Sequence, residues 1–200
     1  LTAPGFFEDY TDVSAVDLFD WPEPEKYIDP EECRKVVEDV PDGYAVLGVV
    51  WSAHFQDACA AFGMEDALVK MFIAPDLFKA VIDKITDFYL RANEIFYKAT
   101  QGKLHAVLIG NDFGSQQGLM VGPEQLRQFV FDGTRRLVEQ AKRYGLKVIH
   151  HSCGSIYDII PDLIEMGVDA IHPIQALASK MEPQRLKNDF DGRASFCGGV

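Results

Sequence analysis

The sequence lacks any apolar run of the roughly 18 residues that a membrane-spanning helix needs. Its opening residues, LTAPGFFEDY, also lack the positive and apolar regions of a signal peptide. Basic side chains are outnumbered, 19 against 31 acidic ones, and the formal net charge is −12. Nucleic acids and anionic membrane surfaces both select basic protein faces, so this balance argues against either partner. We expect an acidic, soluble protein with no nucleic-acid or membrane partner.

Cysteine is scarce and shows no CxxC spacing. Four scattered cysteines in 200 residues do not make a disulfide framework, which favours the reducing cytoplasm. An initiator methionine is also absent, and we expect the chain to begin inside a longer gene product. The cysteines are Cys33, Cys59, Cys153 and Cys197.

Short apolar runs alternate with longer segments that have helical spacing of apolar residues. After an irregular lead-in over residues 1–29, the pattern predicts a domain over residues 30–200. The predicted strands are 43–51, 105–111, 147–152, 169–174 and 194–198. The predicted helices are 30–39, 53–62, 64–72, 75–100, 123–144, 156–166 and 182–190. Such alternation indicates a parallel α/β sheet.

The pattern alone fits both a doubly wound sheet and a barrel. No GxGxxG motif follows a strand, so a dinucleotide-binding sheet has no support. A complete (β/α)8 barrel takes about 250 residues and eight strand–helix units. Since only five strands are predicted here, a barrel would have to be a partial one.

Polar and reactive side chains gather where the predicted strands end. In parallel α/β folds these carboxyl ends carry the chemistry. Four of the five histidines lie there, whereas His105 opens a strand at the opposite end and is predicted to be structural. The candidates for substrate binding are His54, Asn111, Ser155 and Gln175.

The segment HHSCGS is the richest in such residues. Residues two apart in a strand point the same way, so His151 and Cys153 share a face while His150 turns to the other. An imidazole and a thiolate are two ligands of a zinc site, and catalytic zinc usually takes a third from the protein. Asp112 and Cys197 are the candidates for that ligand. The alternative is that the HxC pair binds no metal, which is the commoner case for an isolated pair.

Asp112 and Gln175 each have more than one interpretation. Asp112 follows a strand within GNDFGSQQG, where a carboxylate can act as a general acid or base, accept a hydrogen bond from substrate, or cap a turn. Gln175 can hold a substrate amide or carboxylate, or simply face solvent. We assign catalytic roles to Asp112 and His151, and metal binding to His151, Cys153 and Cys197. The second ring nitrogen of His151 is expected to donate to a carboxylate or backbone oxygen.

Three segments together resemble the uroporphyrinogen decarboxylase superfamily. They are GNDFGSQQGLMVGPEQLRQFV, KVIHHSCGSIYDIIPDLIEMGVDAIHPIQ and EPQRLKNDFDGRASFCGGV, and the similarity extends over about residues 30–200. The resemblance implies an α/β fold in the form of a partial (β/α)8 TIM barrel with parallel strands.

The superfamily has two chemistries. One is decarboxylation of the acetate side chains of uroporphyrinogen, in porphyrin biosynthesis, without a cofactor. The other is methyl transfer between a corrinoid protein and a thiol or folate acceptor, with zinc held by an H-x-C pair and a later cysteine. His151 and Cys153 match that pair, although Cys197 is not an obvious match for the later cysteine.

Of the two, the resemblance favours the zinc-dependent methyltransferase, with a partner protein carrying the corrinoid. The arginine-containing RQAGRY segment of the decarboxylases is absent. Decarboxylation of a tetrapyrrole-type substrate remains the alternative. The sequence leaves the oligomeric state open, with a homodimer as one option.

Overall fold

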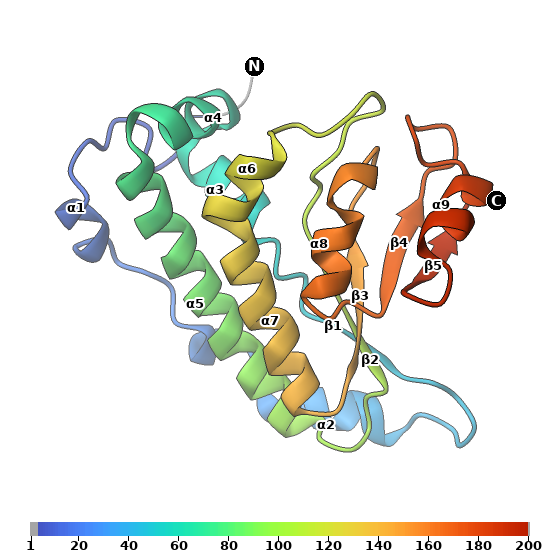
Figure 1. Ribbon diagram of the computed structural model, residues 1–200. Helices are drawn as coiled ribbons and strands as arrows, with labels where there is room; N and C mark the ends of the chain where they lie inside the picture. Colours follow the sequence, from blue (N-terminus) through green and yellow to red (C-terminus); the bar gives the residue numbers. More distant parts are fainter. Residues whose placement is uncertain (1–3, 200) are drawn as a thin grey trace.

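Five apolar runs pair as one parallel sheet in the order β1-β2-β3-β4-β5. The computed structural model describes residues 4–199 (Figure 1). The five predicted strands and their parallel arrangement are confirmed. Each strand is shorter than its predicted range. The strands are β1 (Leu47–Val49), β2 (Ala106–Gly110), β3 (Lys147–His151), β4 (Ala170–Ile174) and β5 (Ser195–Gly198).

Helices connect the strands, and the predicted helices are all present. The helices are α1 (Ser14–Asp17), α2 (Pro30–Glu38), α3 (His54–Phe62), α4 (Met64–Ile73), α5 (Pro75–Ala99), α6 (Pro123–Gln125), α7 (Phe131–Arg143), α8 (Ile160–Glu165) and α9 (Pro183–Phe190). Proline is the first residue of α2 and of α5. The backbone N–H at that position makes no hydrogen bond within a helix, so its absence in proline costs nothing. The helix predicted over 123–144 contains a π-helical turn, Leu126–Val130, between α6 and α7. Within residues 4–199, no helix is long and apolar enough to cross a membrane.

Residues 4–29 form two short helical turns, α1 and a 3-10 turn at Pro24–Lys26, joined by irregular segments. Phe7 anchors this segment: it is 2% exposed, and its ring lies 5.9 Å from that of Phe62 in α3. The indole of Trp21 stacks on Phe7 with a centroid separation of 5.5 Å. The lead-in therefore packs on the helices, and a domain boundary at residue 30 stays a prediction.

The two faces of the sheet have different surroundings. Long helices α5 and α7 run beside each other along one face (Figure 1). The side chains on that face, such as Ile109, Val148 and Ile171, are buried. The opposite face is less covered, since Leu47 and Val49 in β1 are 46% and 52% exposed. These layers, strands alternating with helices around a parallel sheet, make the fold a partial (β/α)8 barrel.

His150 lies on the helix-covered face with Val148. It is fully buried, and its ring stacks on Phe113 at a centroid distance of 5.6 Å. Neither ring nitrogen has a hydrogen-bond partner among residues 4–199. Burial lowers the pKa of His150 from 6.5 to about 3, and the neighbouring His54 and His151 act in the same direction. The folded chain therefore keeps this imidazole neutral.

We predict that His150 makes the fold sensitive to acid. Between pH 6.5 and about 3, the unfolded chain binds a proton at this residue that the folded chain excludes. Its contribution to stability is present above pH 6.5 and is lost as the pH falls. The slope is about 1.4 kcal/mol per pH unit for one proton. His150→Leu should reduce the slope of unfolding free energy against pH, measured by urea unfolding between pH 7 and pH 5.

Val148→Ala is the matched control, because Val148 is a buried neighbour on the same strand. It should lower the unfolding free energy by a similar amount at every pH, since it removes packing and no proton. Equal slopes in the wild type and in His150→Leu would contradict the prediction.

Candidate metal site at the ends of β2 and β3

The carboxyl ends of β2 and β3 lie next to each other because Gly110 pairs with His151 in the parallel register. Glycine permits this approach. A Cβ atom at Gly110 would lie 2.6 Å from both Cβ and the carbonyl oxygen of His151. Asp112 lies two residues after β2, and Cys153 lies two residues after β3. The two residues are therefore close together beyond the ends of the paired strands.

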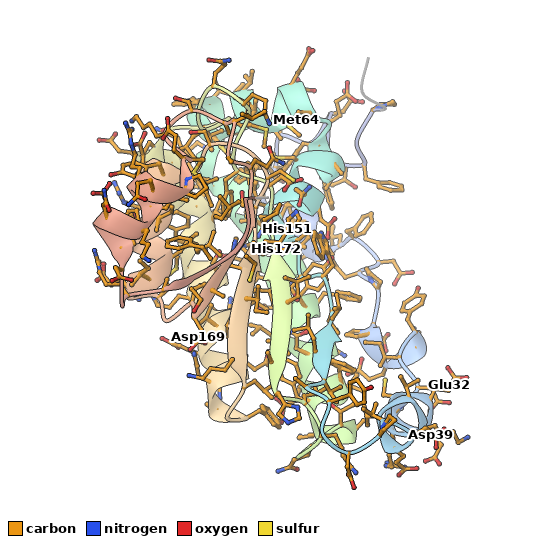
Figure 2. The ribbon with its side chains drawn as sticks, turned by 90° about the vertical axis from the view of Figure 1, so that its right-hand side faces the viewer. Glu32, Asp39, Met64, His151, Asp169 and His172 are labelled. Carbon is orange, nitrogen blue, oxygen red and sulfur yellow. The ribbon has the colours of Figure 1, made fainter. Side chains whose placement is uncertain are left out.

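Asp112, His151 and Cys153 form one cluster. Their candidate ligand atoms all lie within 4.8 Å of one another. Nε2 of His151 lies 3.5 Å from Sγ of Cys153 and 3.4 Å from Oδ1 of Asp112. Among the histidine, cysteine, aspartate and glutamate side chains of residues 4–199, these three form the group whose spacing could hold a metal ion. Figure 2 places His151 toward the carboxyl ends of the strands, far from Asp169 at the start of β4.

The Asp112 carboxylate is fixed by two other elements. Its Oδ1 accepts a hydrogen bond of 2.8 Å from the backbone N–H of Cys153. Its Oδ2 accepts from the side-chain amide of Gln56 in α3 at 3.4 Å, while its own N–H donates to Oε1 of Gln56 at 3.1 Å. These contacts turn the carboxylate toward the histidine and cysteine. Gln56 was not identifiable from the sequence, because nothing in the first turn of α3 indicates which side chain reaches the next loop.

His151 lies between two aromatic rings. The indole of Trp51, after β1, is 4.8 Å away between centroids. On the other side, Nδ1 of His151 lies 3.0 Å from Nδ1 of His172 in β4. The expectation of a carboxylate or backbone oxygen at this nitrogen is wrong. The register pairs His151 directly with His172, and paired residues of adjacent strands share a face, so an imidazole occupies the position.

The surroundings disfavour charge on both His151 and Cys153. Burial lowers the pKa of His151; Asp112 opposes this shift and His172 adds to it. Burial also raises the pKa of the Cys153 thiol, and the Asp112 carboxylate raises it further. Without a metal ion, near neutral pH, the cluster therefore contains a neutral imidazole and a thiol. A metal would have to displace the thiol proton.

The loops after β2, β3 and β4 are tied together beside the cluster. The N–H of Ser155 donates to the carbonyl of Ser115 at 2.8 Å, and the N–H of Ser179 donates to the carbonyl of Gln116 at 3.0 Å. The side-chain amide of Gln116 donates to Oε1 of Gln175 at 2.6 Å. The Gln175 side chain also lowers the pKa of the Cys153 thiol, against the larger effects of burial and Asp112. Gln175 therefore lies near the cluster, and its substrate-binding role stays a prediction.

Three other candidates bind parts of the protein itself. His54 is buried and its ring contacts the carbonyl of Val130 at 3.1 Å. Oδ1 of Asn111 accepts from the N–H of Phe55 at 2.8 Å, at the start of α3. The hydroxyl of Ser155 donates to the carbonyl of Ser179 at 2.6 Å. These contacts join separate segments of the chain, and the substrate-binding roles of the three residues stay predictions.

Cys197 lies on β5, which is separated from β3 by β4. It is half-buried, and it lies outside the cluster formed by Asp112, His151 and Cys153. The structure therefore brings His151 and Cys153 together with Asp112, one of the two candidates for the third ligand, and leaves the other candidate, Cys197, outside the cluster.

We predict that Gly110→Ala destabilises the fold and displaces His151. The added methyl group would press on the backbone of β3, and overpacking of this kind costs about 1–3 kcal/mol. Gly118→Ala is the control, because a Cβ atom there meets nothing within 4 Å. Urea unfolding should show a lower midpoint for Gly110→Ala alone. Equal midpoints for the two variants would contradict the close approach of β2 and β3.

The fold and the residues at its strand ends define the class of protein, a partial (β/α)8 barrel with a candidate metal site. The family model described as "Uroporphyrinogen decarboxylase (URO-D)" matches residues 4–192. The chain belongs to the uroporphyrinogen decarboxylase family.

Among solved structures, the fold is similar to that of a methyltransferase from Methanosarcina mazei. The TM-score is 0.64 at 17% sequence identity, and the match covers 84% of this chain and 46% of that chain. At this identity the likeness concerns the fold alone. The chain spans less than half the length of that protein. No curated protein matches the chain.

Proposed function

We propose that this chain carries the metal site of a zinc-dependent methyltransferase that moves a methyl group between a corrinoid protein and a thiol or folate acceptor. The observation that carries the proposal is the spacing of the ligand atoms of Asp112, His151 and Cys153. The fold likeness to a methyltransferase supports it. The partner is a protein that bears the corrinoid.

The spacing fits tetrahedral zinc. Bonds of about 2.0–2.1 Å to nitrogen, about 2.1 Å to oxygen and about 2.3 Å to sulfur place nitrogen and sulfur about 3.6 Å apart in a tetrahedron, and nitrogen and oxygen about 3.4 Å apart. The corresponding distances from Nε2 of His151 are 3.5 Å to sulfur and 3.4 Å to oxygen. His151 therefore already lies at the spacing that both other ligands need, and the candidate atoms of Asp112 and Cys153 lie within 4.8 Å of each other.

Zinc at this position would lower the pKa of an acceptor thiol and hold it as a thiolate. The chain's own residues would do the rest. His151 and Cys153 would hold the ion, and the Gln175 side chain, which lowers the pKa of the Cys153 thiol, would favour its thiolate. Asp112 would either complete the ligand set or hold a proton at the site, since its carboxylate contacts both other residues. Trp51, 38% exposed, offers an apolar surface beside His151.

Decarboxylation of uroporphyrinogen has less support. A substrate rich in carboxylates needs arginines to bind it. Five of the arginines instead pair with carboxylates on helices, in the lead-in or just before α9. Arg143 ends α7, next to the opposite end of β3. The five paired residues are Arg34, Arg91, Arg127, Arg136 and Arg185.

We predict that the purified chain binds one zinc ion and that Cys153→Ser abolishes this binding. A hydroxyl keeps the shape of the thiol but is a far weaker zinc ligand at neutral pH. The measurement is metal content after dialysis, with the far-ultraviolet circular dichroism spectrum to check the fold. Cys33→Ser, in α2 and outside the cluster, is the matched control and should keep its zinc.

A second pair of variants identifies the third ligand. If Asp112 is that ligand, Asp112→Asn should weaken zinc binding about 10–100-fold or more, whereas Cys197→Ser should leave the dissociation constant unchanged. The opposite result would assign the third position to Cys197. A wild-type chain without zinc after reconstitution would contradict the proposed zinc site.

The reaction itself gives a separate prediction. With methylcobalamin as donor and a small thiol as acceptor, demethylation followed by absorbance should require zinc and should be lost in Cys153→Ser. The same preparation should release no carbon dioxide from uroporphyrinogen. Normal methyl transfer by a metal-free wild type would end the hypothesis, and release of carbon dioxide would favour the decarboxylase.

A further inference from the structure

His172 is the residue of the site that the function proposed above does not use. It lies in β4, half-buried, and the strand register pairs it directly with His151. The two Nδ1 atoms are 3.0 Å apart, and the ring centroids are 5.1 Å apart with a tilt of 48°. Figure 2 shows the two labels together at the carboxyl ends of the strands. Nothing in the ligand set explains this contact, because the metal-facing atom of His151 is the other nitrogen.

Two nitrogens at this distance need one hydrogen between them. In one arrangement His151 donates from Nδ1 to His172, which leaves the Nε2 lone pair of His151 facing Asp112 and Cys153. In the other, His172 donates from Nδ1 to His151, and the Nε2 hydrogen of His151 then points at the Asp112 carboxylate, 3.4 Å away. Only the first arrangement leaves His151 able to bind a metal ion.

We propose that His172 is a positioning residue for the metal site, which holds the His151 ring in place and accepts its Nδ1 hydrogen when Nε2 becomes a ligand. This inference rests on the proposed zinc site. The protons balance as follows: Nε2 of His151 gives its hydrogen to solvent, the shared hydrogen passes from His172 to Nδ1 of His151, and His172 takes one hydrogen on Nε2 from solvent.

The choice of histidine, in place of the more usual carboxylate or carbonyl, has a physical consequence. An oxygen acceptor can serve only the metal-bound arrangement, whereas an imidazole can also donate when the site is empty. The contact therefore persists in both states. A neutral imidazole also adds no negative charge beside the Asp112 carboxylate and the Cys153 thiolate, which together already balance a divalent cation.

Two substitutions separate a hydrogen-bonding role from a merely structural one. Oδ1 of an asparagine lies near the position of Nδ1 in histidine and can accept a hydrogen bond, whereas leucine fills the space without an acceptor. We expect His172→Leu to raise the zinc dissociation constant about 10–100-fold, the usual effect of losing such a partner. His172→Asn should stay close to the wild type. The measurement is competition with a chromophoric chelator, using zinc alone.

His105→Leu is the matched control. His105 precedes β2, at the end of the strand opposite the cluster, and its Nδ1 accepts a hydrogen bond from the N–H of Val46. Removing this imidazole should leave the zinc dissociation constant unchanged. Equal zinc affinity in His172→Leu and the wild type would overturn the inference while leaving the proposed zinc site intact.

Nitrogen-15 spectra of the imidazoles give the second readout. In the zinc-loaded wild type and in His172→Asn, His151 should carry its hydrogen on Nδ1. In the metal-free wild type it should carry it on Nε2, and in metal-free His172→Leu the two forms should mix. If the wild type binds no zinc, the proposed function fails. The metal-free spectra then still decide the role of His172, and identical spectra for wild type and His172→Leu would overturn it.

Discussion

The pairing of β2 with β3 is the constraint on which the site depends. Gly110 lies opposite His151, and only a residue without Cβ leaves room for the backbone and side chain of that histidine. Because the two strands are parallel, the segments that follow them leave the sheet in the same direction. Asp112 therefore lies beside Cys153. The hydrogen bond of 2.8 Å between the Asp112 carboxylate and the N–H of Cys153 then locks the two loops together.

Two adjacent histidines of β3 point to opposite faces of the sheet. His150 is enclosed under the helices without a hydrogen-bond partner in the described part of the chain, and His151 faces the candidate metal site. The alternation of side chains along a strand produces this division. Two adjacent histidines therefore have opposite surroundings. His150 is a neutral, buried ring, whereas both ring nitrogens of His151 contact polar side chains.

Much of this arrangement was predictable from the sequence, and the remainder has identifiable causes. Apolar runs such as Ala106–Gly110, which lies between polar residues, indicate the strands, and the two-residue period places His151 with Cys153. The same period also indicates the direction of the Asn111 side chain. Asn111 has the parity of Val107 and Ile109, which face the helices, so its side chain turns toward α3.

The partnership of His151 with His172 had no such signal, because it depends on the register between β3 and β4. Register is set by packing across the whole sheet. Gln56 was hidden for a similar reason, since its contact with Asp112 joins residues 56 positions apart. Local patterns therefore indicate the candidate site residues, while the residues that hold them in place become visible only in the tertiary structure.

The ties between the three loops bear on the thermodynamics of binding. Backbone and side-chain bonds join Ser115 to Ser155, and Gln116 to Ser179 and Gln175. Ordering a loop around a ligand costs conformational entropy, and here that cost has already been met during folding. An ion or acceptor that enters the cluster meets side chains whose freedom is already restricted. Its affinity should then depend mainly on bond strength and desolvation, and little on the rigidification of the surrounding chain.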